Sequence, residues 1–136
     1  MAATLKLEII TPAAIVFSED VEMVTLTGID GEMGIYPTHM PLMTQLVAGE
    51  VTARKDGQNV FLAVGDGFVQ VTGTRVAVLT DMAVRAENID KVAAEEALQK
   101  AEARLAQKLS DEEAATVQSS IAQASAQIKV KQRYQK

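Results

Sequence analysis

Hydrophobic residues follow two different periods along the chain, and the change falls near Arg85. Before it, apolar and polar residues alternate in short stretches, as in residues 5–10, where every second side chain is predicted to face a core. The turn sequences Lys55-Asp56-Gly57 and Thr72-Gly73-Thr74 each separate two such stretches. The predicted strands cover 5–10, 21–27, 51–54, 60–64, 68–71 and 75–80. This pattern is typical of an all-β sandwich or flattened barrel, with roughly eight to ten short strands within residues 1–86.

Residues 87–136 instead carry the period of an α-helix. Two apolar stripes recur at spacings of three and four residues: Ala94, Leu98, Ala101 and Leu105, then Val117, Ile121, Ala124 and Ile128. Between them, Ser110-Asp111-Glu112-Glu113 predicts a capping box, in which Ser110 caps the second helix and Glu113 bonds back to the backbone. The first helix is expected to end near Leu109, and the two helices to form an antiparallel hairpin.

The seams of this predicted hairpin are half alanine. Burial of a methyl group contributes about 0.8 kcal/mol, against roughly 1.5–3 kcal/mol for a whole leucine or isoleucine side chain. The helices themselves have high intrinsic propensity, with no Gly or Pro after residue 86. We therefore expect helices that persist when undocked, in a hairpin that can change its position.

Charge and composition narrow the function classes. The net charge of −5 argues against nucleic-acid binding, because a protein that tracks phosphates needs a concentrated positive face. With no cysteine, the chain has neither disulfides nor thiolate metal sites. Its first residues lack the features of a secretory or transit peptide, and no window approaches the roughly 18 apolar residues of a membrane-spanning helix. We expect a soluble cytoplasmic protein.

The only histidine, His39, lies in a segment rich in Gly and Pro between Gly31 and Pro41. An acid–base pair of His39 with Glu32 or Asp30 would suit a small hydrolase. No nucleophile is placed beside this pair, however, and an active site needs such a constellation. One histidine and scattered carboxylates also lack the spacing of metal ligands. A loop shaped by its prolines and glycines is the preferred interpretation, so we expect no active site, no metal and no cofactor.

Two further features have open interpretations. Residues 129–136 carry four positive charges and no acid. This segment is either a helix end exposed to solvent or a segment that binds an acidic groove on a partner. Met33, Met40 and Met43 lie on or beside the Gly31–Pro41 segment, where they either fill gaps in the core or form an interaction surface.

Four motifs occur in a fixed order along the chain. They are Gly31-x-x-Gly34-Ile35-Tyr36-Pro37-x-His39-x-Pro41-Leu42, Leu46-x-x-Gly49, Gly65-Asp66-Gly67-Phe68-Val69-Gln70-Val71 and Val76-Ala77-Val78-Leu79-Thr80-Asp81-x-Ala83. Together with the helical hairpin and the length, they resemble the epsilon subunit of bacterial F-type ATP synthases. The resemblance implies a ten-stranded β-sandwich followed by two helices. It also implies a non-catalytic subunit of the central stalk, bound to the gamma subunit and to the ring of c subunits.

The same resemblance assigns residues to these contacts. It places Glu32 against the polar loops of the c ring, His39 at the border of gamma and the c ring, and Thr11 toward gamma. The full implied interface is Thr11, Glu32, Tyr36, His39, Met40 and Pro41. It also implies a rotor-binding domain over residues 1–86 and a regulatory domain over residues 87–136.

In the family the helices are regulatory. Folded against the sandwich they permit ATP hydrolysis, and extended along gamma toward the alpha and beta catalytic subunits they block it. The resemblance makes Lys129, Lys131 and Arg133 candidates for contact with those catalytic subunits.

Some members of the family bind ATP through an Ile/Leu-Asp-x-x-Arg-Ala motif at the start of the first helix. Here the segment is Ile89-Asp90-Lys91-Val92-Ala93-Ala94, so Ala93 stands where those members have arginine. Alanine cannot make the bidentate phosphate contacts of a guanidinium. We expect weak or absent ATP binding, with Asp90 a ligand only if a degenerate site survives.

A different class of function remains open at this point, a stand-alone β-sandwich protein that binds a ligand and oligomerises through its helical tail. As an ATP synthase subunit, the chain would lie peripherally on the cytoplasmic side of a bacterial inner membrane. It would contact the membrane only through the complex. A plastid-encoded counterpart would look the same in sequence.

Overall fold

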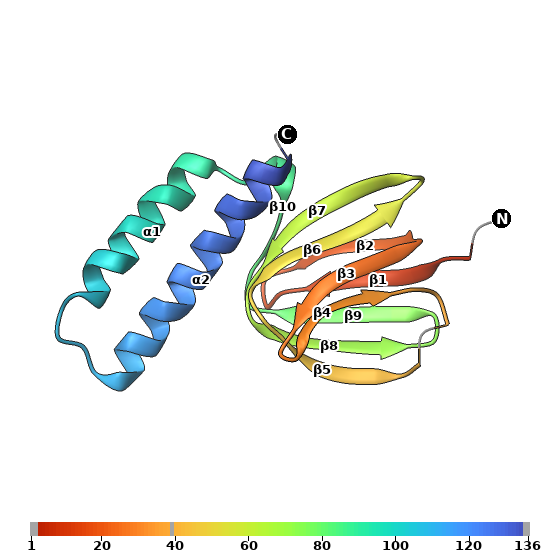
Figure 1. The fold of residues 1–136 in the computed structure, drawn as a ribbon, viewed down its shortest axis with the longest axis horizontal. Coiled ribbons are helices and arrows are strands. Elements are labelled where there is room, and N and C mark those ends of the chain that lie inside the picture. The colour runs from red at the N-terminus through yellow and green to blue at the C-terminus, as the bar shows by residue number, and fades with distance from the viewer. Residues whose placement is uncertain (1–2, 39, 135–136) are drawn as a thin grey trace.

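The N-terminal part of the chain forms one ten-stranded sheet that curls into a two-layered sandwich (Figure 1). The computed structural model describes residues 3–38 and 40–134. The strands are β1 (Leu5–Ile10), β2 (Ile15–Val21), β3 (Met23–Gly28), β4 (Gly31–Ile35), β5 (Leu42–Leu46), β6 (Gly49–Lys55), β7 (Gln58–Val64), β8 (Gly67–Thr72), β9 (Arg75–Thr80) and β10 (Ala83–Arg85). The predicted all-β sandwich followed by a two-helix hairpin is confirmed.

The strand order is β10-β7-β6-β3-β5-β8-β9-β1-β2, with β4 paired to β3 beside this path. Every pairing is antiparallel except that of β1 with β9. The two layers meet at two corners. At one corner, β3 and β5 share a single register pair, Gly28 with Leu46. At the other, β2 approaches β6 through side chains, with Glu19 of β2 paired to Lys55 of β6.

Alternating aliphatic residues fill the space between the layers. In β1, Leu5, Leu7 and Ile9 are buried, as the alternation predicted. The same period recurs in β8 and β9, where every second residue is buried. The largest fully buried side chains are Phe17, Leu7, Ile9, Leu26, Ile35, Leu46 and Leu62. Each such side chain contributes roughly 1.5–3 kcal/mol by leaving water, so this core is the main source of stability.

Both predicted tight turns are present. The β6–β7 turn has positive φ angles of 53° at Asp56 and 76° at Gly57, as a two-residue hairpin of primed type requires. The turn between β8 and β9 is formed by Gly73 and Thr74. The predicted strand over 21–27 differs in its start, because Val21 ends β2 and β3 begins at Met23.

The segment from Gly31 to Pro41 is only partly the loop that the sequence predicted. Its first five residues form β4, which pairs with β3 along its whole length. Within β4, Ile35 is fully buried and Met33 packs against the core, while Glu32 lies exposed on the other face. The glycines at both sides of Glu32 and Met33 hide this alternation in the sequence. Only residues 36–41 form the connection to β5.

A short 3₁₀ turn (Ala86–Asn88) leads into α1 (Lys91–Leu105) and α2 (Asp111–Tyr134), which form the predicted hairpin. The capping box is confirmed, since Ser110 Oγ accepts a hydrogen bond from the Glu113 amide at 3.2 Å. Glu113 Oε1 in turn accepts one from the Ser110 amide at 3.4 Å. The first helix ends at Leu105, earlier than predicted, and Leu105 is 38% exposed rather than part of the seam.

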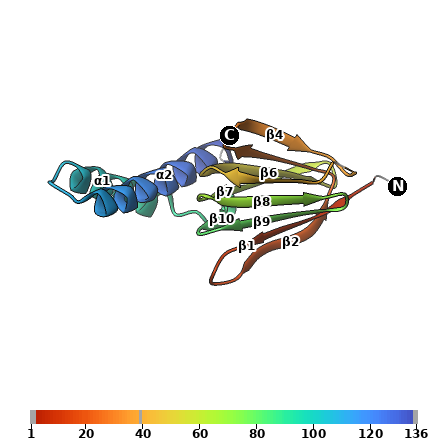
Figure 2. The same ribbon diagram turned by 90° about the horizontal axis from the view of Figure 1, so that it is seen from below.

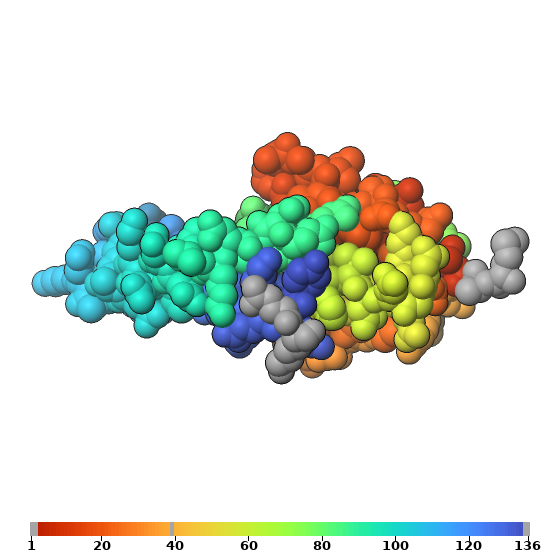
Figure 3. Space-filling view, turned by 90° about the horizontal axis from the view of Figure 1, so that it is seen from above, coloured from red at the N-terminus to blue at the C-terminus, as the bar shows by residue number. Residues whose placement is uncertain are grey.

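The second helix has two buried faces, where the sequence predicted one. Val117 and Ala124 are buried along the predicted stripe, while Ile121 and Ile128 are half-buried. Ala126 and Val130 form a second buried face, which packs against the sandwich. Figure 3 shows the result: the hairpin projects from one end of the sandwich, and the C-terminal part of α2 lies against it.

Candidate functional site

The sandwich has two distinct ends. The helix-facing end holds the turns at residues 11–14, 29–30, 65–66 and 81–82. The far end holds the connections at 36–41, 56–57 and 73–74. Backbone hydrogen bonds fix this assignment, since the Thr38 amide donates to the Gly73 carbonyl at 2.8 Å and the Lys6 amide donates to that of Thr74 at 2.8 Å. Candidate contact residues can therefore be placed by end and by face.

The residues predicted to contact gamma and the c ring lie in separate places. Thr11 lies in the β1–β2 turn at the helix-facing end, where its hydroxyl donates to the Ala14 carbonyl at 3.1 Å. Glu32 is exposed on β4, at the opposite side of the sandwich from the β1–β2 hairpin (Figure 2). Tyr36, Met40 and Pro41 are exposed in the connection at the far end. His39 falls outside the described residues.

A row of apolar side chains crosses the outer face of four strands. Phe68 of β8 lies opposite Leu79 of β9, and Leu79 lies opposite Ile10 of β1. Ile10 in turn lies opposite Ile15 of β2. Phe68 is 56% exposed, Leu79 46% and Ile15 61%. We call Phe68, Leu79, Ile10 and Ile15 the outer apolar row.

The outer apolar row ends beside the β1–β2 turn. A shallow cavity of about 390 Å³ at that point is lined by Ile10, Thr11, Pro12 and Leu79, among others. The row was not predicted, because each residue taken alone is an ordinary outward position of a strand. Apolar outward residues at 68 and 79 are visible in the sequence, but their adjacency depends on strand order. Contiguous exposed apolar surface of this kind marks an interaction site.

The hairpin contacts the sandwich through α2. Its apolar contact consists of Ala126 and Val130 against Ala63 of β7, Ala86 and Ile89, with Phe61 and Val84 partly buried beside them. Four polar contacts accompany it, one of them a hydrogen bond of 3.9 Å from the Gln127 amide to the Met82 sulfur. Gln123 donates to Asp81 at 3.0 Å, the Lys131 ammonium donates to the Ala86 carbonyl at 3.1 Å, and Arg133 pairs with Glu50 at 2.5 Å. A few apolar side chains and these polar contacts make this a modest interface.

The three predicted basic residues therefore differ in their surroundings. Lys131 and Arg133 contact the sandwich in this folded position of the hairpin. Lys129 is exposed and has no hydrogen-bond or ion-pair partner among residues 3–38 and 40–134. The charge of Lys129 is thus available to a partner without any change in the fold.

Both glycines of the Gly65-Asp66-Gly67 motif are required because neighbouring atoms lie where a Cβ atom would be. A Cβ atom at Gly67 would lie 1.9 Å from the Leu79 carbonyl oxygen, and one at Gly65 would lie 2.1 Å from Oδ1 of Asp81. Between them, the carboxylate of Asp66 accepts a hydrogen bond from the Ala48 amide at 2.9 Å. The motif is a turn between strands, as the sequence predicted, and it also leaves room for the Asp81 side chain that contacts α2.

The position of the family's ATP motif opens on a cavity of about 470 Å³ between the helices and the sandwich. Its lining includes Asn88, Asp90, Ala93, Gln123 and Gln127, and none of the described residues that line it is cationic. Asp90 acts as the N-cap of α1, since its carboxylate accepts a hydrogen bond from the Ala93 amide at 3.0 Å. A cavity with one carboxylate and no cation is poorly suited to a triphosphate.

An ion-pair cluster closes the corner between β2 and β6. Glu19 pairs with Lys55 and, at 3.5 Å, with Arg85 of β10. The Arg85 guanidinium also lies 4.9 Å from the ring centroid of Phe17. The hydrogen bond from Lys55 lowers the pKa of Glu19 below its ordinary value of 4.5, against the opposing effect of desolvation. The same hydrogen bond raises the pKa of Lys55.

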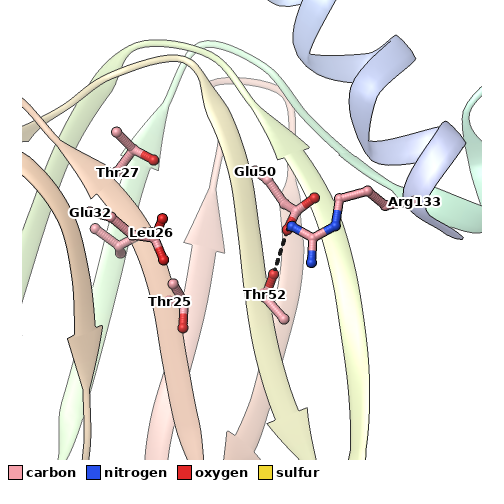
Figure 4. A pocket seen from close by; sticks show the side chains of 7 residues that line it. All are labelled: Thr25, Leu26, Thr27, Glu32, Glu50, Thr52 and Arg133. Atoms are coloured by element: carbon pink, nitrogen blue, oxygen red, sulfur yellow. Dashed lines mark hydrogen bonds and ion pairs between the residues drawn. The ribbon is translucent and has the colours of Figure 1, made fainter.

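A polar pocket of about 260 Å³ lies on the outer face of β3, β4 and β6. Threonine hydroxyls and the carboxylates of Glu32 and Glu50 line it, and Arg133 reaches its edge from α2 (Figure 4).

Of the helices in the described part of the chain, none is both long and apolar enough to cross a membrane.

Comparison with known proteins gives matches along most of the chain. The family model of the ATP synthase delta/epsilon chain β-sandwich domain matches residues 4–86, and that of its long α-helix domain matches residues 87–132. The ATP synthase epsilon chain of Desulforamulus reducens is 44% identical over 111 residues, covering 82% of this chain and 84% of that one. That of Dehalococcoides mccartyi is 50% identical over 106 residues, covering 78% and 76%.

Solved structures share the fold at lower sequence identity. A chain in the Euglena gracilis mitochondrial ATP synthase, solved with OSCP, F1 and c-ring, superposes with a TM-score of 0.76 at 23% identity, covering 91% of this chain and 79% of that one. A chain in the central stalk and c-ring structure of the Tetrahymena thermophila mitochondrial enzyme superposes with a TM-score of 0.62 at 11% identity, covering 97% and 96%.

Proposed function

Because this chain belongs to the ATP synthase delta/epsilon chain family and is thus a non-catalytic subunit of the F-type ATP synthase rotor, we propose that its two parts divide coupling from regulation. Residues 1–86 form the part that binds the rotor, and residues 87–136 the part that regulates ATP hydrolysis. Family membership replaces the hypothesis of a stand-alone ligand-binding protein.

The sandwich binds gamma through the outer apolar row. In the free subunit, the exposed apolar side chains of this row lower solubility: Phe68, Leu79 and Ile15. A partner surface that covered them would remove this cost. The row adjoins Thr11, the residue that the family resemblance directs toward gamma. Two independent arguments, exposure and resemblance, thus favour the same face. This coincidence is the observation that carries the proposal for the sandwich.

The c ring contacts a different part of the sandwich. Glu32 lies exposed on β4, on the side of the molecule away from the β1–β2 hairpin (Figure 2). An exposed carboxylate suits the polar loops of a c ring, and its separation from the outer apolar row leaves both partners room to bind at once. Tyr36, Met40 and Pro41 extend the available surface to the far end. Through these contacts the subunit is peripheral on the cytoplasmic side of the membrane.

The hairpin inhibits ATP hydrolysis when it leaves the sandwich and extends toward the alpha and beta subunits. Its interface with the sandwich rests on three alanines, Val130, Ile89 and a few polar contacts, so undocking exposes a limited apolar surface. The helices keep their own hydrogen bonds and caps after such a change. A two-state element of this kind is what a regulatory subunit requires.

Truncation of the chain after Arg85 tests this function. ATPase activity of the assembled complex should rise when the hairpin is absent, while the sandwich should still assemble with gamma. A full-length subunit and a subunit truncated after Tyr134 serve as controls. Equal activity of the complexes with and without the hairpin would refute an inhibitory function.

A further inference from the structure

Arg133, next to the last residue of α2, ties the end of the hairpin to two neighbouring strands. Its guanidinium lies 2.5 Å from Oε1 of Glu50 on β6 and 5.6 Å from the ring centroid of Phe61 on β7. The same Oε1 atom accepts a hydrogen bond of 2.8 Å from the Thr52 hydroxyl. Figure 4 shows the guanidinium reaching from the helix onto this carboxylate. The carboxylate is thus oriented before Arg133 reaches it.

The local charge makes Arg133 difficult to replace. The pocket beside the pair is lined by Glu32, Glu50 and three threonines, and Arg133 is the only cationic side chain among the described residues that line it. With α2 docked, the Glu50 side chain is 18% exposed and the Arg133 side chain 61%. Undocking of α2 therefore exchanges this ion pair for contact with water, and the folded position gains what a partly exposed ion pair contributes.

No other contact between hairpin and sandwich carries two opposite charges. Among residues 3–38 and 40–134, the remaining ion pairs lie within the sandwich or within the hairpin. Gln123 and Lys131 contribute one hydrogen bond each to the sandwich, both involving a neutral group. The apolar contact, formed by Ala126 and Val130 with Ala63, Ala86 and Ile89, carries no charge.

We propose that the Arg133–Glu50 ion pair is the latch that holds the hairpin in its folded position. The proposal deepens the regulatory function proposed above and rests on it for its physiological meaning. Breaking the pair shifts the hairpin toward the undocked position. A contact shifts an equilibrium only by the difference it makes between the two states, and this pair exists only in the folded one.

The absence of cysteine makes undocking measurable in the full-length chain. One variant has a single cysteine in place of Val130, which is fully buried between α2 and the sandwich. A second variant has it in place of Ala126, which is buried on the same face of α2. The rate at which a thiol reagent modifies each cysteine reports how often the helix leaves the sandwich. Glu50→Gln is then introduced into both backgrounds.

A matched control comes from the ion pair of Arg75 with Glu8, which also spans 2.5 Å and has a carboxylate side chain 17% exposed. That pair lies within the sandwich, so Glu8→Gln should leave the labelling rates unchanged. Glu50→Gln should raise both rates roughly two- to fivefold, the range expected for a partly exposed ion pair. The double variant Glu50→Arg with Arg133→Glu should restore slow labelling, because it rebuilds the pair with reversed charges.

Two outcomes overturn the latch. Unchanged labelling after Glu50→Gln would show that the pair does not hold the helix. Faster labelling at position 130 alone would show that the pair holds only the last turn of α2, because Ala126 lies a turn earlier. The proposed inhibition is judged separately, from ATPase activity of the complex. There, Glu50→Gln should lower activity and truncation after Arg85 should raise it. If labelling rises but truncation has no effect, the latch stands and the inhibitory function fails.

Discussion

Gln123 of α2 donates a hydrogen bond of 3.0 Å to Oδ2 of Asp81, which lies 42 residues earlier in the chain. The carboxylate of Asp81 occupies the space that a side chain at position 65 would need. The glycine at position 65 is therefore a condition for this contact between the hairpin and the sandwich.

Replacing Gly65 by alanine should displace Asp81 and break its hydrogen bond with Gln123. The added Cβ would lie 2.1 Å from Oδ1 of Asp81, so the aspartate must move. Forced repacking of this kind costs about 1–3 kcal/mol, which thermal unfolding can detect. Gly73→Ala is the control, since a Cβ there meets nothing within 4 Å. Equal losses of stability in the two variants would contradict the steric argument.

Replacing Phe68 by glutamine should weaken binding to gamma without lowering the stability of the subunit. The side chain is 56% exposed on β8, between β5 and β9, so its loss leaves the core intact. We expect a loss of about tenfold or more in affinity for gamma, measured by titration calorimetry. The matched control is Val92→Gln, where an apolar residue of α1 is 64% exposed. Similar losses from both variants would mean that the outer apolar row has no special function.

The Glu19 cluster predicts a defined dependence of stability on pH. Because Lys55 lowers the pKa of Glu19 in the folded state, this contribution is present above the unfolded value near 4.5 and is lost as pH falls through the lower, folded pKa. For Lys55 the raised pKa means that its contribution is present below the unfolded value of 10.5 and is lost as pH rises through the folded one.

Glu19→Gln should therefore lower the melting temperature at pH 7 and have no effect at a pH below the folded pKa of Glu19. Asp20→Asn, one residue along the same strand, removes an exposed carboxylate that has no ion-pair partner among the described residues. Melting curves recorded from pH 2 to pH 7 compare the two variants. If the difference in melting temperature between Glu19→Gln and the natural chain stayed the same down to the lowest pH, that result would argue against this cluster.

The isolated subunit should show no micromolar binding of ATP. In the described part of the chain, the cavity at the start of α1 is lined by Asp90 and by no cation, and Asp90 is already the N-cap of the helix. Ala93→Arg should strengthen binding about tenfold or more, because a guanidinium there offers bidentate phosphate contacts. Ala103→Arg adds the same charge at an exposed position of α1 outside the cavity lining. Calorimetry that finds micromolar affinity for the natural chain would refute the prediction.

Lys129→Glu should weaken inhibition of the complex while leaving the docked hairpin unchanged. Lys129 is exposed and has no polar partner among the described residues, so its charge is not used in the folded position. Reversing the charge of Lys131 or Arg133 would instead disturb both the docked and the extended positions of the hairpin, since both residues contact the sandwich when it is docked. ATPase activity of the complex measures the effect, and thiol labelling at position 130 provides the control. Unchanged ATPase activity would exclude Lys129 from contact with the catalytic subunits.

Features set by neighbouring residues could be predicted from the sequence. The alternation of residues 5–10 and the Asp56-Gly57 turn depend on local geometry alone. The capping box at Ser110 is equally local, since both of its hydrogen bonds join residues three apart. Strand β4 was missed because Gly31, on the face of Met33 and Ile35, and Gly34, on the face of Glu32, supply no side chains to mark the alternation.

Features that depend on strand order could not be predicted in this way. The partner of Arg133 is Glu50, 83 residues away, and nothing local to either residue indicates the other. The outer apolar row likewise exists only because β8, β9, β1 and β2 are neighbours in the sheet, although β1 and β9 are far apart in sequence. The resemblance to a family supplied the function, but these contacts required the fold.

The two corners of the sandwich have a mechanical consequence. Most strand boundaries are held by several register pairs, whereas β3 and β5 share one and β2 meets β6 through the side chains of Glu19 and Lys55. Load applied along the strands is carried by the continuous ladders within each layer. Load that shears one layer past the other meets few register pairs, and it is resisted by the core, by the two corners and by the chain connections that run between the layers. The subunit is therefore stiffer within each layer than between the two layers.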